Sequence, residues 1–239
     1  MELHVLLNGI FSTIFVIISI ITGLIIMSKY FKYKQKTFLF VGFTWIGLTS
    51  LWMAKSISVI YNLVTNSDLD IRVFILIGNF TIPITVIIWL FAFTTFTLKK
   101  YKKELILCFS IIGLLMEGYI LYFIFADPTE LTVFIPPIDA NYNLIMTIYH
   151  ISLVCFIFST GFTIGWISLK SENSEVKLKG KFIILSTYSF ILGGLIEIFS
   201  YLGLTLMIVG KLILVMSAIL YYAGWLLPDW IKKLFLRQE

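Results

Sequence analysis

The chain has 239 residues, of which 59% are hydrophobic and only 13% are charged, and its mean hydropathy is +1.00. A soluble domain carries about 25% charged residues to cover its surface, so this composition excludes an ordinary soluble protein. The apolar runs are also too long to be strands of a membrane β-barrel. We therefore expect an all-α, multi-pass protein of the cell membrane.

The basic residues are distributed unevenly along the chain. Fifteen of the 18 Lys and Arg residues lie in alternate loops and in the C-terminal tail. Cytoplasmic loops of membrane proteins carry such an excess. Membrane topology thus explains the net charge of +5, and we expect the lipid bilayer, and no nucleic acid, as a partner.

Seven apolar segments follow one another, each long enough for the roughly 20 residues of a spanning helix. The first follows an N-terminus without basic residues and exceeds a signal-peptide core, so it is expected to remain as a membrane helix. The last two are almost continuous, and we place the turn between them at Tyr201–Leu204, where Gly203 favours a break. The expected helices cover 5–28, 37–64, 73–98, 104–126, 143–169, 182–203 and 205–228.

The loops alternate in charge from one side of the membrane to the other. The loops near 29–36, 99–103 and 170–181 are basic, whereas 66–72 and 127–143 carry most of the loop carboxylates. Lys and Arg concentrate on the cytoplasmic side. The sequence thus predicts a seven-transmembrane-helix bundle (1–228) with its N-terminus outside and its C-terminus in the cytoplasm.

The tail 229–239 is short, amphipathic and basic. Trp230, Ile231, Leu234 and Phe235 can lie in the membrane interface, with Lys232 and Lys233 toward anionic headgroups. The same surface can instead contact a cytoplasmic signalling partner.

Six polar side chains interrupt six different apolar segments. A charge within hydrocarbon costs roughly 2.5–3.5 kcal/mol even on the lenient insertion scale, so such residues usually face a bundle interior or a wet cavity. Threaded by the positive-inside rule, all six fall in the outer half of the membrane at similar depth, which predicts a polar ligand-binding cavity. These residues are Lys55, Asn79, Glu117, His150, Glu197 and Lys211.

Each of these residues also has a structural interpretation. Glu197 and Lys211 lie on consecutive helices and are expected to form an ion pair, which serves either a ligand site or helix packing. His150 can sense pH or simply fill a hydrogen-bonded interior position. Asn79 lies four residues before Pro83, which removes a backbone hydrogen bond, so this helix should kink and the freed carbonyl could contact a ligand.

The loop 127–143 is open to two interpretations as well. It is either a lid over the cavity, stiffened by Pro136 and Pro137, or a solvated acidic loop.

No motif of a soluble enzyme is present in the sequence. His-Glu-x-x-His, Gly-x-Ser-x-Gly, phosphate-loop and Cys-x-x-Cys patterns are all missing. Cys108 and Cys155 lie within apolar segments, where neither a disulfide nor a metal site is expected. We therefore expect no catalytic role, no metal and no cofactor.

Two family resemblances bear on function. Seven helices and a lysine in the last helix resemble microbial rhodopsins, which would imply retinal bound to Lys211. The third helix (73–98), however, lacks the acid and the arginine that this family places there, which disfavours retinal. The end of the chain, Tyr221 to Lys233 with Pro228-Asp229-Trp230, resembles the exit of prokaryotic seven-helix sensor domains. That resemblance implies signal output through a separate cytoplasmic partner.

Three functions remain open on this basis. The preferred one is a receptor-like or sensory membrane protein that binds a small ligand in the outer half of the bundle. A small-solute or proton-coupled transporter is the first alternative, although it would need polar residues in the inner half, which is apolar. A membrane scaffold or assembly subunit without a ligand is the second.

Overall fold

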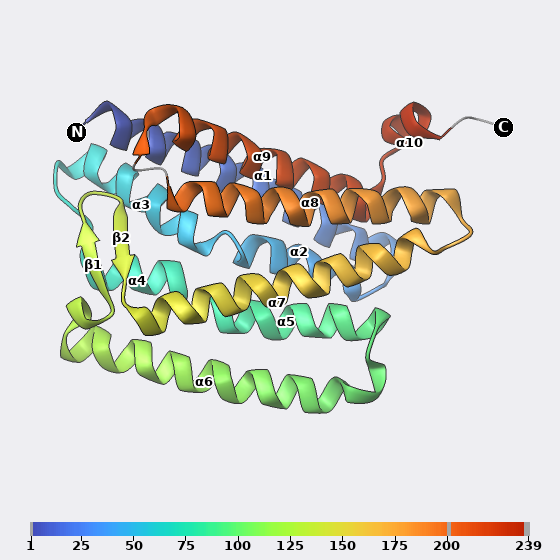
Figure 1. The fold of residues 1–239 in the computed structure, drawn as a ribbon, viewed down its shortest axis with the longest axis horizontal. Helices are drawn as coiled ribbons and strands as arrows, with labels where there is room; N and C mark the ends of the chain where they lie inside the picture. Colours follow the sequence, from blue (N-terminus) through green and yellow to red (C-terminus); the bar gives the residue numbers. More distant parts are fainter. Residues whose placement is uncertain (1, 200–201, 237–239) are drawn as a thin grey trace.

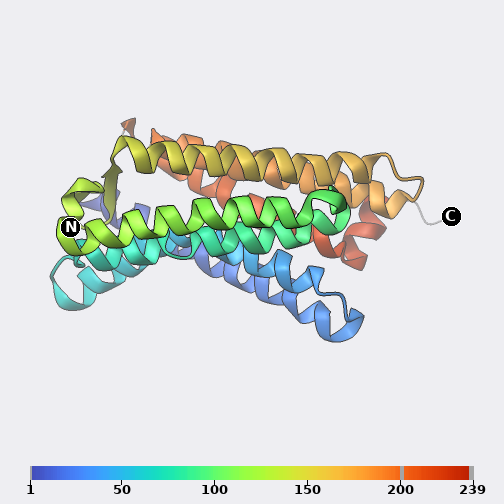
Figure 2. The ribbon, with the colours of Figure 1, turned by 90° about the horizontal axis from the view of Figure 1, so that it is seen from below.

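A computed structural model describes residues 2–199 and 202–236, which form an elongated bundle of helices (Figures 1 and 2). The helices run side by side along the long axis of the molecule. They are α1 (Leu3–Tyr33), α2 (Thr37–Gly47), α3 (Ser50–Thr65), α4 (Ile71–Asn79), α5 (Ile82–Phe96), α6 (Lys102–Ala126), α7 (Leu144–Leu169), α8 (Ser174–Ile198), α9 (Leu204–Leu226) and α10 (Asp229–Phe235), with short 3₁₀ turns at Lys99–Tyr101 and Pro128–Glu130.

The helices meet the requirements of membrane spans. In the described part of the chain, six are long and apolar enough to cross a bilayer, with α4 and α5 counted as one segment. The pair α2 and α3 passes the same test together but is bent by 50°, so the number rises to seven if this pair is one span. These helices support the architecture of a multi-pass helical membrane protein, as the composition predicted.

The two ends of the bundle differ in their loops. One end carries the N-terminus, the α3–α4 loop and the strands β1 (Thr132–Ile135) and β2 (Asp139–Tyr142), and we call it the hairpin end (Figure 1). The opposite end carries α10 and the loops at 34–36, 97–101 and 170–173, and we call it the basic end. The chain termini therefore lie at opposite ends of the molecule.

Several boundaries differ from those expected. Helix α1 continues to Tyr33 instead of ending at 28, and α8 begins at Ser174 instead of 182. The early start of α8 is set by Asn173, whose side chain accepts hydrogen bonds from the backbone N–H groups of Glu175 and Val176, as an N-cap does. Hydropathy locates apolar surface, and therefore misses the polar turns that extend a helix into water.

Two expected spans are interrupted, and a turn separates the last two. Near Pro83, where a kink was expected, the helix is interrupted: α4 ends at Asn79 and α5 begins at Ile82 with Pro83 in its first turn. The expected turn between the last two spans is placed after Ile198 and before Leu204; Tyr201 lies outside the described residues. The break between α2 and α3, at Leu48 and Thr49, was not predicted.

The segment 127–143 is more ordered than a plain loop. β1 and β2 pair antiparallel, with Thr132 opposite Tyr142 and Ile135 opposite Asp139. Ser58 donates a hydrogen bond to the carbonyl of Pro137, and Phe134 and Ala140 pack beside Ala54 and Phe74. The hairpin is therefore docked onto α3 and α4.

Glycines let neighbouring helices approach closely, as is common in membrane bundles. Between α8 and α9, a Cβ added at Gly193 would lie 3.0 Å from the carbonyl oxygen of Gly210 and 2.8 Å from Leu214. Between α7 and α8, Gly165 and Gly180 face each other in the same way. Helix α6 lies at the margin of the bundle and packs chiefly on α5 (Figure 1).

Replacing Gly193 with Ala should lower the stability of the purified protein in detergent by about 1–3 kcal/mol, because the added methyl group overpacks the α8–α9 contact. Gly194 is the matched control, since nothing lies within 4 Å of a Cβ added there. Gly194→Ala should be neutral or slightly stabilising. Thermal unfolding of both variants in one detergent measures the difference, and equal melting temperatures would contradict the close approach.

Candidate functional site

The carboxylate of Glu197, in the last turn of α8, accepts three hydrogen bonds from side chains. Its Oε1 lies 2.5 Å from Lys211 Nζ and 2.9 Å from Lys55 Nζ. Its Oε2 accepts from the indole Nε1 of Trp52 at 2.9 Å. The ion pair expected between Glu197 and Lys211 is confirmed, and Lys55 joins it.

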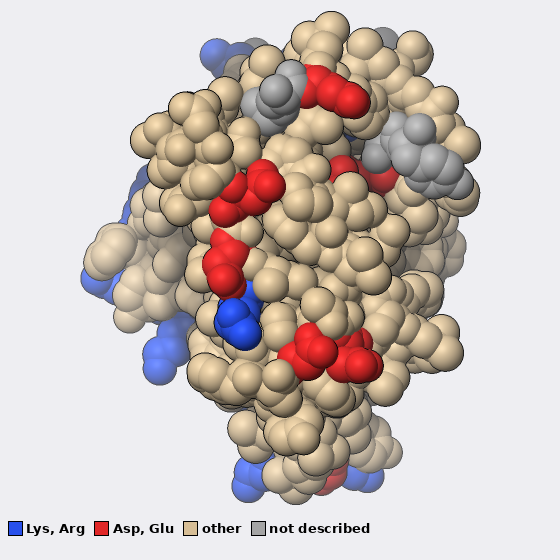
Figure 3. Space-filling view, turned by 90° about the vertical axis from the view of Figure 1, so that its left-hand side faces the viewer, with Lys and Arg blue, Asp and Glu red and all other residues tan. Residues whose placement is uncertain are grey.

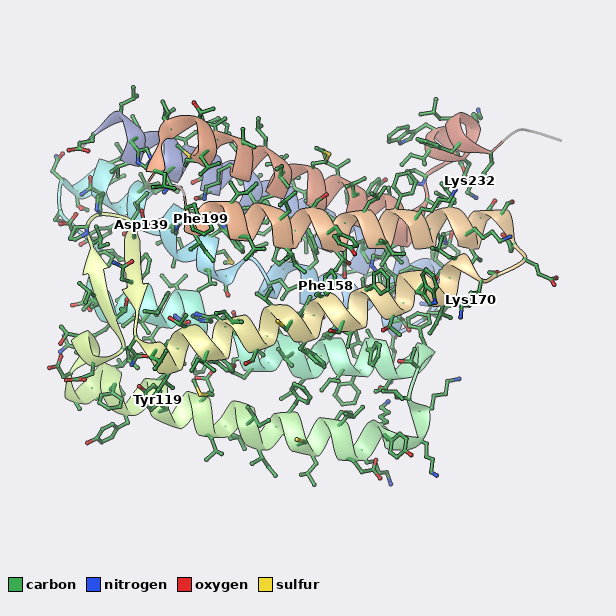
Figure 4. The ribbon with its side chains drawn as sticks, viewed as in Figure 1. Tyr119, Asp139, Phe158, Lys170, Phe199 and Lys232 are labelled. Atoms are coloured by element: carbon green, nitrogen blue, oxygen red, sulfur yellow. The ribbon has the colours of Figure 1, made fainter. Side chains whose placement is uncertain are left out.

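The two lysines extend this group of residues in opposite directions. Lys55 Nζ also contacts Asp139 of the hairpin at 2.7 Å. Lys211 Nζ donates to the hydroxyl of Ser12 on α1 at 2.7 Å. Side chains from four helices and the hairpin therefore form one ionic network, made of Ser12, Trp52, Lys55, Asp139, Glu197 and Lys211; Figure 4 shows Asp139 beside the end of α8.

The helix geometry explains why these side chains converge. Trp52 and Lys55 are three residues apart on α3 and so share one face of that helix. Lys211 follows Gly210, whose close approach to Gly193 brings α9 against α8. Glu197 lies one turn beyond Gly193 on the same face of α8, which places its carboxylate within reach of Lys211.

Burial makes the charge balance of the network important. Lys211 is fully buried and the Glu197 side chain is 8% exposed, whereas Lys55 is 18% and Asp139 39% exposed. Two ammonium groups face two carboxylates, so the formal charges cancel. An unpaired charge in such a place is strongly unfavourable, so each member depends on the others. Exposure rises from Lys211 to Asp139, which makes Asp139 the member most accessible to water.

Asn79 and His150 form a second group with a residue of the hairpin. Asn79 is fully buried, and its amide nitrogen donates to the carbonyl of Ile75 and to the hydroxyl of Tyr142. His150 Nε2 lies 2.8 Å from Asn79 Oδ1, and because an amide oxygen only accepts, the imidazole donates. Tyr142 also packs edge-on against His150, and its burial raises the pKa of the phenol. We call these three residues the amide cluster.

Glu117 lies apart from both groups, on the marginal helix α6. Its two carboxylate oxygens are buried and have no hydrogen-bond partner among the described residues. The six residues singled out from the sequence are thus divided into Lys55, Glu197 and Lys211 in one group, Asn79 and His150 in another, and Glu117 alone.

A small crevice lies beside both groups, where α2 bends into α3. Trp52 of the ionic network and His150 of the amide cluster line it, together with apolar residues of α3, α5, α7 and α8 such as Leu51, Val86 and Phe190. Its volume is about 80 Å³, well below the roughly 300–1,000 Å³ of a pocket for a drug-sized ligand. It is a small crevice with a mainly apolar lining.

Four members of these groups were not singled out from the sequence. Trp52 carried a usable signal, since it lies one turn before Lys55 on the same helix face. Asp139 and Tyr142 carried none, because their roles depend on how the hairpin folds back onto α3 and α4. Ser12 is one of many hydroxyl residues in apolar segments, and nothing local marks it.

No protein-family model, no curated protein and no solved structure is significantly similar to this chain. Among the described residues, no group of three His, Cys, Asp or Glu side chains is arranged to hold a metal ion, and Cys108 and Cys155 are free thiols.

Single substitutions in the ionic network should destabilise the protein more than their combination. Glu197→Gln leaves the network with a net charge of +1 and Lys211→Met leaves it with −1, and breaking a buried pair costs roughly 3–5 kcal/mol. The double variant restores neutrality, with Lys55 still paired to Asp139. Its loss of unfolding free energy, measured in detergent, should therefore be clearly smaller than the sum of the two single losses. Losses that add to within about 0.5 kcal/mol would show that the two residues are independent.

Proposed function

We propose that the chain crosses the membrane seven times, with the hairpin end outside and the basic end in the cytoplasm. Helices α2 and α3 together lead from the basic end to the hairpin end (Figure 1), which favours one bent crossing. Acidic residues gather on the hairpin end, with basic residues mainly at its rim (Figure 3). The opposite end carries three lysine-rich loops and α10, as the cytoplasmic face of a membrane protein does.

We further propose that the protein is a receptor-like or sensory membrane protein that detects a small polar ligand at the hairpin end. The observation that carries this proposal is the double contact of Lys55, which bridges Asp139 of the hairpin and Glu197 of α8. A ligand that engages the accessible Asp139 competes for Lys55. Because Glu197 shares Lys55 with Lys211, such competition changes the charge balance between α8 and α9.

Helices α8 and α9 connect this network to the basic end. They pack closely along their length, and at the far end Leu178 of α8 and Ala223 of α9 pack against Ile231 of α10. A small displacement of α8 relative to α9 therefore reaches α10 through packed side chains. The resemblance of Pro228-Asp229-Trp230 to the exit of prokaryotic sensor domains agrees with output at this point, through a separate cytoplasmic partner.

Two alternatives make different use of the same contacts. A proton-coupled transporter would need titratable groups along the whole path, yet the buried polar side chains of the described chain are Ser and Thr hydroxyls apart from Asn8, Asn79 and Lys211. A scaffold would need only the stabilising effect of the network, since buried ion pairs can serve to fix helix register. In either role a retinal cofactor on Lys211 is disfavoured, because its ammonium group is already bonded to Glu197 and Ser12.

Cysteine labelling tests the seven-span topology. In a protein with Cys108 and Cys155 replaced by Ser, a membrane-impermeant maleimide should label Ser67→Cys in intact cells. It should label Gln35→Cys only after permeabilisation. If α2 and α3 instead formed a re-entrant loop, both positions would lie on the same side and would label together, which would contradict a seventh span.

Ligand titration tests the receptor proposal. We expect at least one compound from a panel of small amines, organic acids and inorganic ions to raise the melting temperature of the wild-type protein saturably. Binding at 100 times the dissociation constant adds about 2.7 kcal/mol of stability. Asp139→Asn should abolish this shift, because it removes the accessible member of the ionic network.

Glu130→Gln is the matched control, since it removes a carboxylate from the same loop whose side chain makes no ion pair in the described structure. It should retain the ligand-induced shift. A panel without any saturable shift, in a protein that the Asp139→Asn substitution merely destabilises, would support the scaffold instead.

A further inference from the structure

A second and larger cavity lies at the basic end, far from the ionic network. Its volume is about 460 Å³, within the range of pockets for small ligands. The last turns of α1, the first turns of α8, the end of α9 and α10 form its walls. Segments from the N-terminal and the C-terminal parts of the sequence thus line one space.

The lining of this basic-end cavity has an excess of positive charge. Lys29, Lys32, Lys179 and Lys232 line it, against two carboxylates, those of Glu175 and Asp229. Both carboxylates lie near Lys232, at 3.0 Å and 4.0 Å.

The three other lysines have no such neutralisation, and of these Lys32 is exposed. Lys29 and Lys179 are half-buried, and neither makes an ion pair in the described part of the structure. Two ammonium groups on separate helices therefore remain for an anion.

Trp225 also lines the cavity, with 8% of its surface exposed. Its indole nitrogen is buried, and its ring lies beside that of Tyr221. The groups that can contact an anion in the cavity are therefore the lysines of its lining.

We propose that this cavity binds a phosphate-bearing anion, held by Lys29 and Lys179. Phosphate offers several acceptor oxygens and a charge that matches two ammonium groups. Tyr33, Tyr222 and Trp225 also line the cavity, and such aromatic residues concentrate at the depth of lipid headgroups. The phosphate therefore comes either from an anionic phospholipid or from a soluble phosphorylated molecule. In both cases the bound anion ties α1 to α8.

Binding of defined probes to the full-length protein in neutral detergent tests this proposal. The probes are short-chain phosphatidic acid, short-chain phosphatidylcholine as the zwitterionic control, inorganic phosphate and ATP. We expect phosphatidic acid or a soluble phosphate to bind saturably and to raise the melting temperature. The double variant Lys29→Gln, Lys179→Gln should bind the same probe at least about tenfold more weakly, because each basic residue contributes to the attraction.

The control variant is Lys99→Gln, Lys103→Gln, which removes the same charge from the basic end but from residues that do not line the cavity. It should retain wild-type affinity within about twofold. Binding of phosphatidic acid alone identifies a headgroup site, whereas binding of phosphate or ATP identifies a soluble ligand.

The proposal is overturned if neither phosphatidic acid nor a soluble phosphate binds, if phosphatidylcholine binds as tightly as phosphatidic acid, or if both double variants lose affinity equally. If the Lys29, Lys179 variant does not fold, Lys179→Gln compared with Lys103→Gln gives the same contrast.

Discussion

Two lysines share one carboxylate in a part of the bundle that has little access to water, and removing any one of the three groups upsets the balance of charge there. The position of Glu197 at the end of α8 thereby constrains α3 through Lys55 and α9 through Lys211. The hairpin is constrained too, because Lys55 carries a second contact to Asp139. The close glycine contact between α8 and α9 and the docking of the hairpin onto α3 are both necessary for this balance of charge.

Between the two ends of the molecule the core is aromatic and uncharged. Trp45 of α2 stacks on Tyr221 of α9 with ring centroids 4.0 Å apart, and Trp45 also contacts Phe190 of α8. Trp89 of α5 donates to the hydroxyl of Thr160 on α7. The structure thus separates a hairpin end that carries the ionic network and the amide cluster from a basic end that contains a cavity, and joins them through large side chains.

Much of this architecture follows from composition and hydropathy, because a bilayer requires long apolar segments and charged residues inside them are conspicuous. The contact between Glu197 and Lys211 could be predicted, since a short turn must place their helices side by side. The break at Leu48 and Thr49 was not predicted, although the residue directly before it, Gly47, is of a type that favours a break. Asp139 and Tyr142 could not be predicted as partners for another reason. Their contacts depend on how the hairpin folds back over the bundle, and the position of a residue along a helix gives no information about that. Glu117 was grouped with the other five residues only because it lies at a similar depth along its helix. In the structure its carboxylate has no hydrogen-bond partner among the described residues.

The sequence separation within the ionic network has a consequence for biogenesis. Ser12 lies 199 residues before Lys211, and Lys55 lies 142 residues before Glu197. During co-translational insertion, α3 reaches the bilayer with an ammonium group whose partners have not yet been synthesised. Helix α3 can be placed stably only after the last two helices have been inserted, because an isolated charge favours the membrane interface over the hydrocarbon. We therefore expect the placement of α3 to be completed only when the C-terminal half has been inserted, and a truncation that removes Glu197 would leave Lys55 without this partner.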